Sequence, residues 1–308
     1  MSDIIYDVIV VGGAPAGLTA ALYTSRENLN TLILEKAQCG GLPATTELIE
    51  NYPGFPEGIN GMELMQKFKE QAVRFQAQIK EFNEVKSVKP EGKIIKVATD
   101  NGEFQAHAVI VGSGSIPKPL GVSGEDKLRG RGVSYCATCD GPLFRGKDVA
   151  IIGCGNSGLQ EGEALLKYVK SVTFVEFLPE MTASKVLQDR LKKHENAEFL
   201  LNHQLTAING EGLVSSITLK DRSNGQEKQI PVAGVFMYVG FLPNSKFLEN
   251  IVKLDKYGYI ISDERMQTNI PGLYAVGDVR SKEIRQITVA CAEGTIAAVA
   301  VRDYLKEL

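Results

Sequence analysis

The sequence contains no apolar run long enough to cross a membrane. A spanning helix needs roughly 20 consecutive apolar residues, and no such stretch occurs along the 308 residues. The N-terminus reads MSDIIYDVIVVGG, with acidic residues before a short apolar strand, and it lacks the basic region and long apolar segment of a signal peptide. We therefore expect a cytoplasmic protein that does not enter a membrane.

A basic stripe is also missing. The 34 Lys and Arg residues are outnumbered by 37 Asp and Glu, the net charge is -3, and both signs are scattered along the chain. Binding to nucleic acid relies on clustered cations that neutralise phosphates. We therefore expect no nucleic-acid partner.

Cysteine and histidine are scarce. The five cysteines stand at positions 39, 136, 139, 154 and 291, and only Cys136 and Cys139 are close together. An odd number with one close pair is a poor framework for structural disulfides. The three histidines are scattered, whereas zinc usually needs two further Cys or His ligands at short spacing. We expect no metal, and we interpret Cys136 and Cys139 as a redox-active dithiol; the alternative is two buried thiols without a redox role.

The composition is that of an ordinary globular protein, with 44% hydrophobic and 23% charged residues. A length of 308 residues indicates two domains, because one domain usually has roughly 100 to 200 residues. No segment is of low complexity.

One local plan occurs twice: an apolar strand, a glycine-rich turn, a helical pattern and a second apolar strand that ends in an acid. In the first copy the strand covers 6–11, the turn GGAPAG covers 12–17, the helix reaches about residue 26, and TLILE ends at Glu35. In the second copy the strand covers 148–152, the turn GCGNSG covers 153–158, the helix reaches about residue 170, and SVTFVE ends at Glu176.

Such a unit is typical of a nucleotide-binding site. Glycines permit a tight turn, the helix N-terminus presents free N–H groups to a pyrophosphate, and the acid accepts hydrogen bonds from a ribose. A single copy could equally be a tight turn without chemistry, but two copies with placed acids favour two nucleotide sites. Ala14 departs from the pattern, since it replaces the middle glycine. The candidate residues are Gly12, Gly13, Ala14, Pro15, Ala16, Gly17 and Glu35 in the first copy, and Gly153, Gly155, Asn156, Ser157, Gly158 and Glu176 in the second.

Two Gly- and Pro-containing stretches, near 114–119 and 241–244, have the composition of paired linkers. They predict an outer domain of residues 1–115 and 245–308 and an inserted domain of residues 116–244. Short β-rich runs at 82–109 and 213–236 predict a small antiparallel sheet on each domain. The expected fold is α/β, with two Rossmann-like three-layer nucleotide-binding domains, one inserted into the other.

Several stretches together resemble a known family over nearly the whole chain. They are ENYPGFP at 50–56, SYCATCDGPLFRGK at 134–147, GCGNSG, the GLYAVGD segment and RQITVACAEG at 285–294. The chain resembles the low-molecular-weight thioredoxin reductases, and EFLPEMTAS and GPLFRGK also resemble the reductase portion of the alkyl hydroperoxide reductase flavoprotein subunit.

The resemblance implies that the outer domain binds FAD and the inserted domain binds a nicotinamide nucleotide. It implies that the FAD pyrophosphate lies at the first turn, the adenosine ribose at Glu35 and the ribityl chain at Asp278. Asn51 and Gln286 would approach the isoalloxazine ring. The resemblance further implies FAD contacts at Gly41, Leu42, Gly114, Gly277, Arg285 and Ile287.

The nicotinamide is expected to be NADH, with NADPH disfavoured. NADPH-using members of the family carry a His-Arg-Arg run and a further Arg for the 2′-phosphate, whereas this chain has Glu176, Phe177, Leu178 and Thr182 at the matching positions. A carboxylate repels a phosphate and accepts hydrogen bonds from a free ribose hydroxyl. Some relatives without the cationic run use another electron donor, and that alternative stays open.

The resemblance also assigns roles around the dithiol. Electrons would pass from NADH through FAD to Cys136 and Cys139, and then to the disulfide of a thioredoxin-like protein. Cys139 would face the flavin, Cys136 would attack the partner, and Asp140 would carry the proton; alternatively Asp140 is only a turn residue before Gly141. A homodimer is implied too. The linkers would let the inserted domain rotate between two orientations.

Two other functions stay open. The acceptor could be another carrier, glutaredoxin-like or part of a peroxide-scavenging system, or the enzyme could be fed by ferredoxin. A flavin-binding redox sensor without turnover is the third interpretation. Purified carriers and steady-state disulfide reduction would separate these functions.

Overall fold

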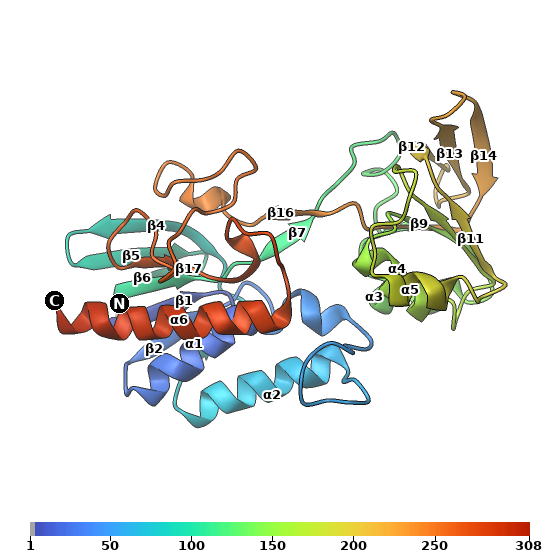
Figure 1. The fold of residues 1–308 in the computed structure, drawn as a ribbon. Helices are drawn as coiled ribbons and strands as arrows, with labels where there is room; N and C mark the ends of the chain where they lie inside the picture. The colour runs from blue at the N-terminus through green and yellow to red at the C-terminus, as the bar shows by residue number, and fades with distance from the viewer. Residues whose placement is uncertain (1–3) are drawn as a thin grey trace. The chain divides into compact units, whose positions relative to one another are not determined.

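A computed structural model describes residues 4–308, which form two compact units (Figure 1). Unit 1 comprises the chain up to Ile116 together with Leu242–Leu308, and unit 2 comprises Pro117–Phe241. The strands β7 (Ser115–Pro117) and β16 (Phe241–Pro243) pair with each other where the chain passes between the units. Within residues 4–308 no helix has both the length and the apolar character that crossing a membrane requires.

Unit 1 is built on a seven-stranded sheet. Along the sheet the strands are β3 (Gln78–Lys80), β2 (Thr31–Leu34), β1 (Ile5–Val11), β6 (Gly102–Val111), β5 (Ile94–Thr99) and β4 (Val85–Glu91), and β17 (Leu273–Ala275) also pairs with β6. β3, β2, β1, β6 and β17 are parallel, whereas β4, β5 and β6 pair antiparallel. The long strand β6 serves both parts: its first half pairs with β5 and its last three residues pair with β17.

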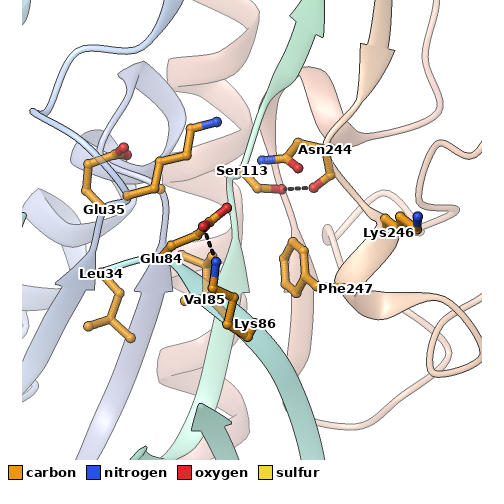
Figure 2. A pocket seen from close by; sticks show the side chains of 12 residues that line it. Leu34, Glu35, Glu84, Val85, Lys86, Ser113, Asn244, Lys246 and Phe247 are labelled. Carbon is orange, nitrogen blue, oxygen red and sulfur yellow. Dashed lines mark hydrogen bonds and ion pairs between the residues drawn. The ribbon is translucent and has the colours of Figure 1, made fainter. Parts of the chain in front are cut away.

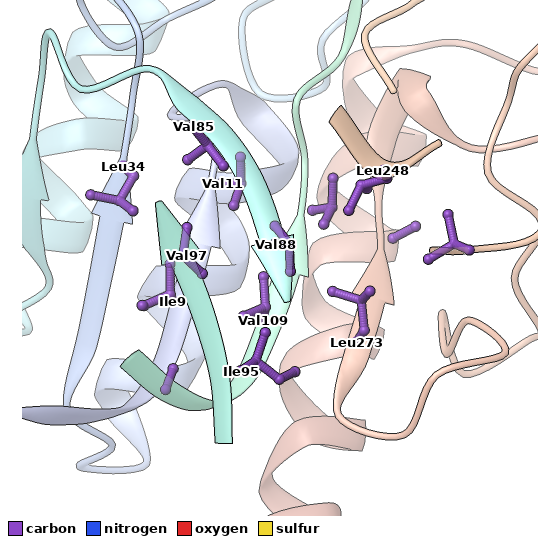
Figure 3. Close-up of a cluster of buried hydrophobic side chains, with 14 of the residues drawn as sticks. Ile9, Val11, Leu34, Val85, Val88, Ile95, Val97, Val109, Leu248 and Leu273 are labelled. Carbon is purple, nitrogen blue, oxygen red and sulfur yellow. The ribbon is translucent and has the colours of Figure 1, made fainter. Parts of the chain in front are cut away.

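Both faces of the parallel part are buried. On β1, Val8 and Val10 pack toward the helices, whereas Ile9 and Val11 belong to the cluster on the opposite face (Figure 3). A strand that is covered on both faces has a continuous apolar sequence instead of an alternating one. The helices of unit 1 are α1 (Pro15–Arg26), α2 (Gly61–Arg74) and α6 (Ile287–Lys306), with short 3-10 turns η1 (Leu42–Thr45), η3 (Lys246–Leu248) and η4 (Gly277–Val279).

Unit 2 repeats this architecture. Its parallel sheet has the order β11 (Ala197–Leu200), β10 (Ser171–Val175), β9 (Asp148–Ile152), β15 (Gly234–Met237) and β8 (Val133–Ser134). An antiparallel sheet of β12 (His203–Asn209), β13 (Ser216–Asp221) and β14 (Glu227–Pro231) accompanies it. The helices are α3 (Ala137–Asp140), α4 (Asn156–Leu165) and α5 (Lys185–Leu191), and η2 (Gly141–Phe144) follows α3.

The α/β fold with two Rossmann-like domains is confirmed, but two local predictions were wrong. The second helix ends at Leu165, before the expected residue 170, and turns carry the chain to β10. The antiparallel sheet of unit 2 begins at His203, and β15 belongs to the parallel sheet. A short apolar run such as β15 has no periodicity that would reveal which sheet it joins.

Candidate functional site

The first glycine turn leaves no room for side chains at two of its positions. A Cβ added at Gly12, whose φ is +103°, would lie 2.3 Å from the carbonyl oxygen of Gly112. A Cβ at Gly17 would lie 1.9 Å from the carbonyl oxygen of Gly12. The turn leads into α1, which begins at Pro15 without a side-chain cap. Uncapped N–H groups at a helix start are available to a phosphate.

The acid at the end of β2 is tied to this turn. Glu35 is 9% exposed, and its carboxylate accepts the backbone N–H of Gly13 at 2.7 Å and of Ala37 at 3.0 Å. Glu35 and Gly12 both line a cavity of about 410 Å³ in unit 1, which Figure 2 shows. The cavity therefore opens where a nucleotide at the turn would place its ribose.

The second turn has the same geometry. A Cβ at Gly153, with φ +107°, would lie 2.2 Å from the carbonyl oxygen of Tyr238, and one at Gly158 would lie 2.0 Å from that of Gly153. Gly155 precedes α4, which starts at Asn156 and Ser157 without a side-chain cap. The two turns are therefore structural counterparts, one in each unit.

Glu176 repeats the contacts of Glu35. Its carboxylate accepts the N–H of Cys154 at 2.7 Å and that of Leu178 at 3.1 Å. In both copies the acid contacts the second residue of the glycine turn and the residue two positions after itself. Each carboxylate oxygen keeps a further lone pair, which is available to a ribose hydroxyl.

Other residues that the resemblance assigned to FAD gather in unit 1. The side-chain amide of Asn51 donates to that of Gln286 at 3.0 Å, although 235 residues separate them. A Cβ at Gly41 would lie 2.8 Å from the methyl group of Ala14, and one at Gly277 would lie 2.9 Å from that of Ala16. The remaining candidates lie at element starts or in loops: Leu42 starts η1, Ile287 starts α6, and Gly114 has a φ of +68°.

Arg285 carries a buried polar atom without a partner. Its Nε makes no hydrogen bond to any residue in the described part of the chain, and its guanidinium lies 4.2 Å from the centre of the Tyr259 ring. A buried donor without an acceptor costs stability. Such a donor is consistent with a bound group that accepts its hydrogen bond.

A buried ion cluster that the sequence analysis missed holds the turn before Asp278. Glu293 accepts the backbone N–H of Gly277 at 2.7 Å, Nη1 of Arg280 at 2.7 Å and Nζ of Lys282 at 2.9 Å. Lys282 also lies 3.9 Å from Asp278, so the carboxylates of Glu293 and Asp278 share this one cation. Burial raises the pKa of Asp278, and the nearby Lys282 opposes that shift. No spacing rule connects Glu293 to residues 13 and 16 positions earlier.

The dithiol lies at the start of α3 in unit 2. Cys136 and Cys139 form a disulfide with their Cα atoms 5.3 Å apart, and the N–H of Cys139 donates to Sγ of Cys136 at 3.1 Å. The Ser134 hydroxyl donates to Asp140 at 2.6 Å and accepts the N–H of Cys136 at 3.1 Å. Ser134, which the sequence analysis did not select, thus connects Asp140 with the dithiol.

Beneath the dithiol, the phenol of Tyr238 accepts the N–H of Ala137 at 2.9 Å. Burial raises the pKa of Tyr238, and Glu161 adds to the shift, so the phenol stays protonated. Because the backbone of Tyr238 also contacts the second glycine turn, this residue adjoins both candidate sites of unit 2.

The three remaining cysteines are reduced. Burial raises the pKa of Cys39 and of Cys154 to about 12, and Glu81 and Glu176, respectively, add to the shift. Burial also raises the pKa of Cys291. Protonated thiols are poor nucleophiles, so these three residues are better suited to packing than to redox chemistry. Within residues 4–308 no cluster of His, Cys, Asp and Glu could hold a metal ion.

Comparison with known proteins finds one matching family and several similar proteins. The family model described as pyridine nucleotide-disulphide oxidoreductase matches residues 6–294. The thioredoxin reductase of Bacillus subtilis is 44% identical over 306 residues, which cover 99% of this chain and 96% of the relative. The crystal structure of Lactococcus lactis thioredoxin reductase in its FR conformation has a TM-score of 0.96 at 36% identity, covering 98% and 100% of the two chains. That of T. acidophilum thioredoxin reductase has a TM-score of 0.94 at 41% identity, covering 98% of each.

Proposed function

The chain belongs to the pyridine nucleotide-disulphide oxidoreductase family, and we propose that it transfers electrons from NADH to the disulfide of a thioredoxin-like protein. It is a flavin-dependent disulfide reductase that uses a nicotinamide. What we propose beyond this is the identity of the electron donor, NADH, and of the acceptor, a thioredoxin-like protein.

The observation that carries the proposal is the Cys136–Cys139 disulfide in the unit that also holds the second glycine turn. A pair of cysteines separated by two residues accepts and releases two electrons as one disulfide. The duplicated turn supplies two nucleotide sites, as a flavoprotein that takes electrons from a nicotinamide requires.

The residues of unit 1 fit FAD. Gly12 and Gly17 have no space for a side chain, the cavity contains Glu35, and Nε of Arg285 is buried without a partner in the described chain. We assign the pyrophosphate to residues 12–17, the ribose to Glu35 and the remaining contacts to the residues that the resemblance implies. When bound, FAD supplies the two-electron couple between a nicotinamide and a disulfide.

The choice of NADH rests on Glu176. Glu176 directly follows β10, and its carboxylate lies next to the second turn. A ribose hydroxyl would donate a hydrogen bond to this carboxylate, whereas a 2′-phosphate would be repelled by it. Glu176 therefore selects against NADPH without any steric barrier.

In the disulfide exchange, the Cys136 thiolate attacks one sulfur of the partner disulfide, and the other partner sulfur leaves as a thiolate. The Cys139 thiolate then attacks Cys136, which restores the intramolecular disulfide and releases the reduced partner. The two electrons and two protons of the dithiol end on the partner. Asp140, which accepts the Ser134 hydroxyl at 2.6 Å beside the dithiol, would carry the proton to and from the sulfur atoms.

Anaerobic mixing of the purified yellow protein with NADH or NADPH tests the donor. Rapid loss of flavin absorbance with NADH alone supports the proposal, whereas rapid loss with NADPH contradicts the argument from Glu176. Loss with neither points to ferredoxin or another donor. Purified thioredoxin-like and glutaredoxin-like carriers, added in turn, then identify the acceptor.

We also propose that the chain works as a homodimer in the cytoplasm, on the resemblance to its family. Analytical ultracentrifugation of the full chain tests the assembly, and a sedimentation coefficient of a monomer at micromolar concentration would contradict it.

A further inference from the structure

In unit 2 the guanidinium of Arg222 lies over an exposed aromatic ring. Its central carbon is 3.7 Å from the centre of the Phe177 ring. Arg222 follows β13 in the sequence, whereas Phe177 directly follows Glu176. Nη1 of Arg222 donates to the carbonyl oxygen of Phe177 at 2.8 Å and to the side-chain oxygen of Asn202 at 3.2 Å. The guanidinium is thus fixed in position over the ring.

Backbone hydrogen bonds hold this arrangement together. The N–H of Arg222 donates to the carbonyl of Asn202 at 2.9 Å, and the N–H of Asn202 donates to that of Leu178 at 2.8 Å. The N–H of His203 donates to the carbonyl of Glu176 at 2.9 Å. Asn202 adopts a left-handed conformation with φ +57°, which asparagine tolerates better than most residues. Two segments distant in the sequence, at 202–203 and at Arg222, therefore fix the loop after Glu176.

Two large apolar side chains of this loop are open to solvent. Phe177 is 48% exposed and Leu178 is 41% exposed. A dinucleotide with its pyrophosphate at the second glycine turn and its ribose at Glu176 carries its adenine beyond that acid, toward the residues that follow it. A flat aromatic surface is what a base needs for stacking, and an arginine stacks on an aromatic face in the same way.

We propose that Phe177 is the stacking platform for the adenine of the nicotinamide dinucleotide and that Arg222 is the positioning residue that supports it from behind. The guanidinium covers one face of the ring and prevents its rotation, and the other face receives the base. This inference rests on the proposed use of a nicotinamide dinucleotide and names the part of the chain that recognises its adenosine.

The alternative role for Arg222 is to bind a 2′-phosphate. Its Nε and Nη2 donate to no residue within 4–308, but Nη1 is engaged by Phe177 and Asn202, and the carboxylate of Glu176 stands on the neighbouring residue. A negative charge beside the site disfavours a phosphate and leaves a neutral base unaffected. The arrangement thus explains how a chain without the cationic run holds a dinucleotide.

Equilibrium binding of NAD⁺ and NADP⁺ to the full-length, FAD-loaded protein tests the proposal, measured by isothermal titration calorimetry. The oxidised nucleotides do not reduce the flavin, so binding is read without turnover. We expect Phe177→Ala to weaken NAD⁺ binding about ten-fold, the loss of one stacked base, and Phe177→Tyr to bind like the unaltered chain. Arg222→Ala and Arg222→Lys should each weaken it about three-fold, because lysine keeps the charge but not the plane.

The double variant decides whether Arg222 acts through Phe177. If it does, Phe177→Ala with Arg222→Ala binds NAD⁺ no more weakly than Phe177→Ala alone. Lys228→Ala, which removes a cation from β14 of the same sheet, is the matched control and should leave binding unchanged. Circular dichroism checks that each variant is folded.

Four outcomes would overturn the inference. Additive losses would show that Arg222 contacts the ligand directly, and a larger effect of Arg222→Ala on NADP⁺ than on NAD⁺ would make it a phosphate ligand. Unchanged NAD⁺ binding by Phe177→Ala, with the unaltered chain binding NAD⁺ normally, would show that Phe177 is not the stacking platform and would leave the proposed donor intact. If the unaltered chain itself bound neither nucleotide, the proposed nicotinamide donor would fail, and the platform would fail with it.

Discussion

The carboxylate of Glu176 accepts the backbone N–H of Cys154 at 2.7 Å, across 22 residues of sequence. Glu35 and Gly13 repeat this relationship, with the same distance and the same separation. Each acid ties the end of its strand to a glycine turn and keeps lone pairs for a ribose. Because the two sites have matched geometry in separate units, a change in one provides the control for the other.

Glu35→Gln should weaken FAD binding about ten-fold. The amide has one acceptor oxygen where the carboxylate has two, so it cannot hold both backbone N–H groups and a ribose hydroxyl. The dissociation constant is measured by adding FAD back to the apoprotein. Glu176→Gln is the matched control, which should retain FAD normally and lose affinity for NAD⁺. An equal loss of FAD from both variants would contradict the assignment of one nucleotide to each turn.

Gly158→Ala should destabilise the protein by about 2 kcal/mol and abolish NAD⁺ binding. The added methyl group would lie 2.0 Å from the carbonyl oxygen of Gly153, so the turn must shift. Urea denaturation gives the stability, and calorimetry gives the affinity. Gly212→Ala is the control, since its methyl group would meet nothing within 4 Å and its φ is not positive. NAD⁺ binding by Gly158→Ala as tight as that of the control would contradict the role of the second turn.

Glu293→Gln should cost about 3 kcal/mol of stability and reduce FAD retention. The side chains of Glu293, Arg280 and Lys282 are 7%, 14% and 9% exposed, so the change leaves two buried cations without their carboxylate. Glu63→Gln, which breaks an exposed pair with Lys67, should cost at most about 0.5 kcal/mol. Similar urea midpoints for the two variants would show that the cluster does not stabilise the turn before Asp278.

Alkylation of the reduced protein should modify Cys136 and Cys139 and spare Cys39 and Cys154. With a pKa of about 12, the thiols of Cys39 and Cys154 are only about one part in 10⁴ thiolate at pH 8. Since the pKa is raised, the reactive fraction grows about ten-fold for each pH unit up to that value. Mass spectrometry after iodoacetamide at pH 8 and pH 10 measures the modification, and unfolding in urea should make all five cysteines reactive. Rapid labelling of Cys154 at pH 8 in the folded state would contradict its burial.

The features that the sequence predicted well are local. The glycine turns, the acids and the dithiol lie within short stretches whose spacing itself requires the geometry. Asn51 and Gln286 could be connected only through the resemblance, because 235 residues separate them. Their roles, like those of the other assigned site residues, stay predictions.

The features that the sequence analysis missed depend on long-range contacts. The sequence directly after Glu176 lacks the cationic run, whereas the fold brings Arg222 to Phe177 from a hairpin 45 residues away. No sequence pattern indicates that Glu293 on α6 holds the turn at Gly277, or that Tyr238 supports α3. These contacts form only when the fold brings distant strands and helices together, and no periodicity in the sequence predicts which residues then meet.

The most direct test of the account asks whether NADH reduces the dithiol. The oxidised, FAD-loaded protein is incubated anaerobically with NADH, quenched with an alkylating agent and analysed by mass spectrometry. The account predicts that Cys136 and Cys139 are both alkylated after NADH and neither is alkylated without it, while Cys154 stays unmodified in each case. Bleaching of the flavin with the Cys136–Cys139 disulfide still intact would contradict the account.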